Sequence, residues 1–147
     1  MTILDRTKFI KDGIFVIGSL LAESITDPQS TNRTSNEKFV LTAWPDRPVR
    51  YPVISVEQTE LNSKSIGTKG LNSLTSINME IMIFSKSTNE RDILAGSIFA
   101  VMEQNQAVIS ASGLIDQRFY NITNMDDSGS QGLHKKLLGV RYSWPSQ

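Results

Sequence analysis

The stretch LTSINMEIMIFS, residues 74–85, predicts the clearest strand of this 147-residue chain. From 77 to 83 its odd-numbered positions are apolar: Ile77, Met79, Ile81 and Ile83. Successive side chains of a strand point to opposite faces, so one face of this strand must enter a core. Directly after it, Ser87 and Glu90 form a capping box, which predicts that a helix begins there. A strand that passes straight into a capped helix is the feature from which the fold is assigned.

Two amphipathic helices are predicted. The helix after Ser87 should end near Asn105, and a first helix should cover Ile3 to Ile25. Apolar residues recur at helical spacing in both, which predicts one buried stripe on each. The stripe of the first helix contains Ile3, Ile10, Ile14, Ile17 and Leu21. The stripe of the second contains Leu94, Ile98, Val101 and Met102, flanked by Ala95 and Phe99.

Four further strands are expected around these elements. Two precede residues 74–85, at Lys38–Trp44 and Tyr51–Gln58, and two follow the second helix, at Leu114–Asn124 and His134–Trp144. The predicted fold class is therefore α+β, a mainly antiparallel sheet of about five strands packed with two helices, in the order α-β-β-β-α-β-β. We expect residues 1–147 to form one domain, since the chain length suits a single core.

Polar residues dominate Glu60 to Ser73, which we interpret as a long flexible loop or the tip of a splayed hairpin. A polar segment of this length inside a compact domain is usually functional or disordered. We therefore predict that the segment binds a neighbouring subunit or another partner. For any single lysine in it, a solvated loop without a partner is the alternative. The candidate partner-binding residues of the segment are Asn62, Lys64, Ser65, Lys69 and Asn72.

Met82 and Phe84 are apolar although they point away from the face of Ile81 and Ile83. Either helices cover both faces of the sheet, or part of the second face meets another subunit. Two helices cover both faces only with difficulty. Met82 and Phe84 are therefore added to the candidate partner-binding residues, and we expect an oligomer.

Composition argues against several classes of function. Fifteen basic and fifteen acidic residues balance, which disfavours a nucleic-acid-binding protein. The apolar run at residues 14–22 is far too short to span a bilayer, so we expect no membrane partner. There is one histidine and no cysteine, so one chain cannot supply a multi-histidine or thiolate metal site. His134 with Asp126, Asp127, Ser128 and Ser130 has no motif of a catalytic triad, and we expect no enzyme and no cofactor.

The order of elements resembles that of the tail terminator (tail completion) proteins of long-tailed phages and related head–tail viruses. The similarity rests on the first helix, the strand Tyr51–Val56, the strand Met79–Ser85 that runs into the capped helix at Ser87, and the closing strand Leu137–Tyr142. It implies a homo-oligomeric ring, usually a hexamer, that caps the tail tube and joins the head connector or stopper protein. It also implies a place in the virion, at the tail–head junction, after assembly in the host cytoplasm.

Three alternatives remain open. Another neck protein, such as a stopper or connector ring, would have a similar subunit. A small dimeric α+β module that binds a ligand or regulates a partner is the second alternative. An enzyme is the third alternative, but the sequence contains no recognisable set of catalytic residues.

Overall fold

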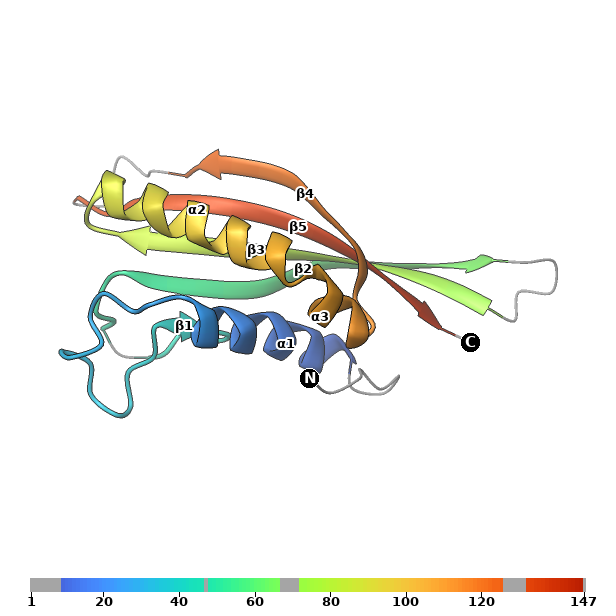
Figure 1. Cartoon of the computed structure of the whole chain (residues 1–147), viewed down its shortest axis with the longest axis horizontal. Coiled ribbons are helices and arrows are strands. Elements are labelled where there is room, and N and C mark those ends of the chain that lie inside the picture. Colours follow the sequence, from blue (N-terminus) through green and yellow to red (C-terminus); the bar gives the residue numbers. More distant parts are fainter. Residues whose placement is uncertain (1–8, 47, 67–71, 126–131, 147) are drawn as a thin grey trace.

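The computed structural model describes residues 9–46, 48–66, 72–125 and 132–146. Figure 1 shows a twisted sheet with helices along it. The predicted α+β class and the α-β-β-β-α-β-β order are confirmed, with one short additional helix, α3. In chain order the elements are α1 (Phe9–Ser24), β1 (Val40–Leu41), β2 (Val53–Ile66), β3 (Asn72–Ser85), α2 (Thr88–Gln104), α3 (Gln106–Ala111), β4 (Ile115–Asn124) and β5 (His134–Ser146).

The sheet has five strands in the order β1-β2-β3-β5-β4. β2, β3, β5 and β4 are antiparallel to their neighbours, and β1 alone runs parallel to β2. The last strand of the chain, β5, therefore lies between β3 and β4 (Figure 1). This insertion places β5 beside β3, a strand that precedes α2 in the chain.

The core lies between the sheet and the helices, on one face of the sheet. The odd-numbered positions of β3 at 77, 79, 81 and 83 are fully buried, as the alternation predicts. Ile17 and Leu21 of α1 and Leu94, Ile98 and Met102 of α2 pack into the same cluster as those strand residues. Both long helices of the described chain thus cover one face, and the face of Met82 and Phe84 carries neither of them. Phe99, predicted to flank the stripe, is 40% exposed.

The start of α2 follows the predicted capping box. The backbone N–H of Glu90 donates to Ser87 Oγ at 3.3 Å, and the Ser85 hydroxyl donates to the Glu90 carboxylate at 2.7 Å. The helix ends at Gln104 with Asn105 as its C-cap, close to the predicted position. Local capping chemistry is readable from sequence because both partners lie within one turn.

The predicted extent of the first strand, Lys38–Trp44, is wrong. Only Val40 and Leu41 pair with β2. Phe39, on one side of this pair, is buried in the core, whereas the Trp44 ring packs against Phe84 on the other face. The chain bends at Thr42 and Ala43, directly after this pair, so the strand ends several residues earlier than predicted.

Of the two interpretations of Glu60 to Ser73, the flexible loop is wrong for its described residues and the hairpin is confirmed for them. β2 continues to Ile66, β3 begins at Asn72, and the two are paired from Glu60↔Asn78 to Ile66↔Asn72. Cross-strand pairing joins backbone N–H and C=O groups, which every residue carries whatever its side chain. A polar sequence therefore forms a long hairpin here, with one irregularity between Gln58 and Glu60.

We predict that Ile81→Asp unfolds the subunit. Ile81 is fully buried, and an unpaired carboxylate there costs on the order of 4 kcal/mol in free energy of unfolding. Urea denaturation followed by circular dichroism measures the loss. The matched control is Ile93→Asp on α2, where the side chain is 60% exposed and the same substitution should change the free energy by less than about 1 kcal/mol. Equal effects of the two substitutions would contradict the assigned register.

Candidate functional site

A long hairpin arm, made by the outer parts of β2 and β3, carries most of the predicted partner-binding residues. Asn62, Lys64 and Ser65 lie in β2 and Asn72 begins β3, and their backbones are paired with the opposite strand. Lys69 lies outside the described residues. Figure 1 shows the arm running past α3 and beyond the helix layer, accompanied by the end of β5. These residues share one projecting element, and their role in partner binding stays a prediction.

Met82 and Phe84 lie on the helix-free face, defined here as the sheet face opposite α1 and α2. Both are half-buried. The Phe84 ring meets the Trp44 ring edge-on at a centroid distance of 5.1 Å, and Lys135 Nζ lies 5.7 Å from the Phe84 ring centre. Part of this face is therefore covered by the chain itself. Contact of Met82 and Phe84 with another subunit stays a prediction.

On the helix-free face, positive and negative side chains also lie at different ends of one row of residues. No sequence pattern predicted this separation of charge. One row across the sheet runs from Arg118 on β4 through Arg141 on β5 and Asn78 on β3 to Glu60 on β2. Arg141 Nε donates to Asn78 Oδ1 at 2.9 Å, and Asn78 Nδ2 donates to Glu60 Oε2 at 3.1 Å. The row thus begins with cations at one edge of the sheet and finishes with a carboxylate at the other.

The Tyr120 ring shields Gly139 on the same face. A Cβ atom built on Gly139 would come within 2.6 Å of the ring, so only glycine lets the ring lie flat on β5. Arg141 lies 5.4 Å from the centre of this ring, within the range of a cation–π contact. Tyr120 remains 44% exposed, so it adds an aromatic surface next to the basic residues.

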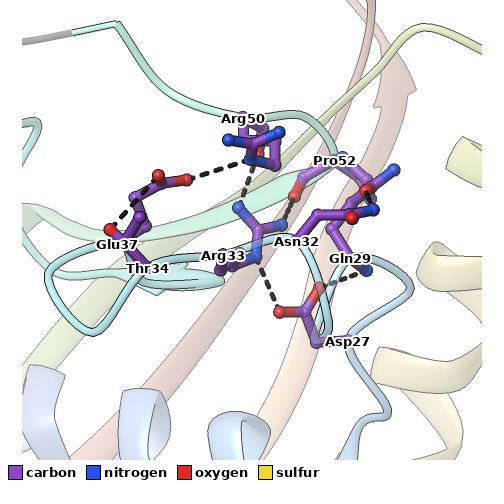
Figure 2. A network of polar contacts seen from close by, with 8 residues as sticks. All are labelled: Asp27, Gln29, Asn32, Arg33, Thr34, Glu37, Arg50 and Pro52. Carbon is purple, nitrogen blue, oxygen red and sulfur yellow. Dashed lines mark hydrogen bonds and ion pairs between the residues drawn. The ribbon is translucent and has the colours of Figure 1, made fainter.

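Arg33 holds the segment between α1 and β1 against the start of β2 (Figure 2). Its Nε donates to Asp27 Oδ2 at 2.6 Å, one Nη donates to the carbonyl oxygen of Arg50 at 2.6 Å, and the other donates to the carbonyl oxygen of Pro52. The guanidinium also lies 5.5 Å from the ring centre of Phe39. With its side chain only 5% exposed, Arg33 is a buried structural clamp in the segment between α1 and β1.

Two carboxylates, on Glu37 and Asp92, have lowered pKa values. A hydrogen bond from Arg50 lowers the pKa of Glu37, and Figure 2 shows this pair beside the Arg33 clamp. Hydrogen bonds from Arg91 and then Lys136 lower the pKa of Asp92 from 3.8 to about 2. Because Lys136 belongs to β5, the Asp92 carboxylate links α2 to the sheet at 2.8 Å.

Residues considered for chemistry are dispersed or outside the described chain. His134 lies at the start of β5, where its backbone pairs with Ser85. Asp126, Asp127, Ser128 and Ser130 lie outside the described residues. Among the residues that the structure describes, no group of three His, Cys, Asp or Glu side chains could hold a metal ion. No described helix has the length and apolar character to cross a membrane.

A groove of about 750 Å³ lies between the end of α1 and the first turns of α2. Its lining mixes hydroxyl and apolar side chains, including Ser24, Ser97 and the exposed Ile93. The volume is within the range of small-molecule sites. This groove is the observation that supports the alternative of a small ligand-binding module.

We predict that Arg33→Met destabilises the protein by about 2–3 kcal/mol, because two backbone carbonyls and Asp27 lose their donor together. Urea denaturation measures the change. Arg50→Met is the control: it keeps the backbone carbonyl that Arg33 uses and removes only a side chain that is 46% exposed, so it should cost less than about 1 kcal/mol. If both variants unfold at the same urea concentration as the wild type, Arg33 is not a clamp.

We predict an acid-sensitive contribution from Asp92. Its pKa is about 2 in the folded protein and 3.8 as the ordinary value, so its stabilising effect is complete above pH 3.8 and is lost as the pH falls toward about 2. The melting temperature of Asp92→Asn should therefore be lower than that of the wild type at neutral pH. The two melting temperatures should converge in this acid range. A difference that stays constant across the range would rule out the carboxylate as its cause.

No protein-family model and no curated protein matches the chain. Among solved structures, the chain is similar to one in a structure described as the virion of a native gene transfer agent (GTA) particle. The TM-score is 0.47 at 12% sequence identity, over 89% of this chain and 85% of that chain. A likeness at this level does not assign a family or a function.

Proposed function

We propose that this protein is a structural subunit of a phage-like virion, and that it closes as a ring, most simply a hexamer, on the end of the tail tube. The observation that carries the proposal is the one-sided packing of the sheet. Both long helices of the described chain bury one face, while the other face and the β4 edge are left for contacts outside the subunit. The α-β-β-β-α-β-β order agrees with that of the tail terminator proteins.

The hairpin arm supports contacts along the axis of such a ring. Strands and their edges suit lateral contacts within a ring, whereas an arm that projects past the helix layer can reach a different protein (Figure 1). We assign the arm to the tail tube protein or to the head connector. The polar sequence of the arm suits a contact between proteins that have folded before they bind each other.

The proposed activity is stoichiometric, without turnover: a ring occupies a tube end and stops further polymerisation. A subunit in this role works at the tail–head junction of the particle and has no catalytic residue. A stopper or connector ring is the nearest alternative, and it would use the same surfaces. A dimeric ligand-binding module is favoured by one observation alone, the groove of about 750 Å³ beside Ile93.

We predict that loss of the gene gives tail tubes of irregular and excessive length, together with heads that carry no tail. The physical reason is that a growing tube end without a cap continues to add subunits. Electron microscopy of a lysate from the deletion strain measures tube length and head attachment. Complementation with the wild-type gene, and with a His134→Ala variant, should both restore particles, because the proposed role needs no catalytic histidine.

The alternatives give different images. Tails of normal length that remain unattached would favour a stopper or connector ring. Tails of normal length joined to full heads would reject a role in the particle neck. A small molecule that co-purifies with a dimer would support the ligand-binding module.

A further inference from the structure

The edge strand β4 has few of the features that usually protect a sheet edge. β4 pairs with β5 on one side, and the strand order leaves its other side without a partner strand in the described chain. Natural edges are commonly blunted by charged side chains, above all lysine, by proline or by very short strands. β4 has ten residues with neither lysine nor proline, and residues 119–125 carry no charge. Its protective features are the charged Asp116 and Arg118 and the irregular pairing near Arg118 and Tyr120.

Exposed apolar groups accompany this open edge. On the helix side of the sheet, the Phe99 and Phe119 rings lie 4.8 Å apart, Phe99 is 40% exposed and Ile122 is 50% exposed. On the helix-free side, Tyr120 is 44% exposed. A long edge with apolar groups on both sides is a hazard unless another strand covers it. The β4 edge therefore requires a partner strand.

The opposite edge of the sheet is also open along much of its length. β1 pairs with β2 at Ile54 and Ser55, and no other described strand continues along that side of β2. Residues 57–61 of β2 thus form the available part of this edge. They include Glu57, which lies directly opposite Glu80 of β3 on the helix-free face.

The two open edges have opposite charge. Like charges directly opposite each other in a sheet are unfavourable, and each edge contains such a pair: Arg118↔Arg141 near β4, and Glu57↔Glu80 near β2. Arg118 forms an exposed ion pair with Asp116 at 3.2 Å, a contact that contributes little in water and is readily exchanged. Joining the β4 edge to the β2 edge places cations beside carboxylates and relieves both like-charge pairs.

Strand direction permits this joining without turning a subunit over. β2, β3, β5 and β4 alternate in direction, so β4 is antiparallel to β2. A second copy placed alongside in the same orientation therefore presents its β2 antiparallel to β4 of the first. The Arg118 row also contains Glu60, which brings opposite charges to nearly the same height on the two edges. This contact is head-to-tail, the kind that closes rings.

We propose that copies of this protein join through their sheet edges, with β4 of one subunit antiparallel to residues 57–61 of the next, and with Arg118 near the neighbour's edge carboxylates, Glu60 in the same row and Glu57 one turn of the pleat further along. This inference rests on the ring assembly of the proposed function and names its contact. The occupant of the β4 edge is a second copy of the same chain.

Charge reversal tests the contact with the full-length protein. Arg118→Glu and Glu57→Arg should each weaken self-assembly by about tenfold or more, measured by mass photometry across a concentration series. In a head-to-tail contact the mixture of the two single variants restores assembly, because each altered edge meets the complementary altered edge. The double variant restores it for the same reason. Glu103→Arg, an exposed reversal on α2, is the control and should assemble like the wild type.

Cross-linking provides a second measurement that does not depend on charge. The chain has no cysteine, so Asn121→Cys on β4 and Thr59→Cys on β2 introduce unique thiols. With a short bis-maleimide, the double-cysteine variant should give a ladder of oligomers, and neither single variant should. A dimer from Asn121→Cys alone would mean that two β4 edges meet, and would overturn the proposal. A double variant that stays monomeric would overturn it too.

The outcomes separate this contact from the proposed function. If tails are terminated normally by variants with either reversed edge, the ring uses another surface, and the edge contact fails while the function stands. If the wild-type chain joins through its edges but its deletion leaves tails normal, the contact stands and the role in the tail fails.

Discussion

The apolar face of β3 is the constraint on which the rest of the structure depends. Ile81 lies between Val56 of β2 and Leu138 of β5, and all three are fully buried. Both long helices of the described chain pack on this face, α1 beside β2 and α2 over β3 and β5. Since the helices share one face, the opposite face is covered in part by a hydrogen-bonded polar row and by the Trp44 and Phe84 rings, which meet edge-on. Burial of one face thus determines which residues form the core and which face of the sheet is left without a helix.

Sequence predicted the parts of the fold in which local pattern and burial agree. The alternation in β3 is periodic, and the partners of the Ser87 cap lie within one helical turn. Prediction failed where stability comes from backbone partners far away in the chain. The hairpin arm is held by cross-strand pairing of polar residues, and Arg33 donates to carbonyls 17 and 19 residues away. No local periodicity encodes either arrangement.

The candidate surfaces were predictable in part for the same reason. Met82 and Phe84 could be placed on a second face because strand alternation alone assigns them there. The opposition of charge between the edges depends on strand order, which inserts β5 between β3 and β4. Arg118 and Glu60 share a row only through Arg141 and Asn78, so their relation becomes visible once the register is known.

The insertion of β5 between β3 and β4 has a consequence for synthesis on the ribosome. The sheet is assembled out of chain order, because the strand that joins β3 to β4 follows both of them in the sequence. Until Leu138 and Val140 emerge, β3 has one neighbour missing and β4 has none in the sheet. Docking of β5 therefore completes the core and creates the β4 edge in a single late step. A chain that lacks β5 therefore cannot present β4 as an edge of this sheet.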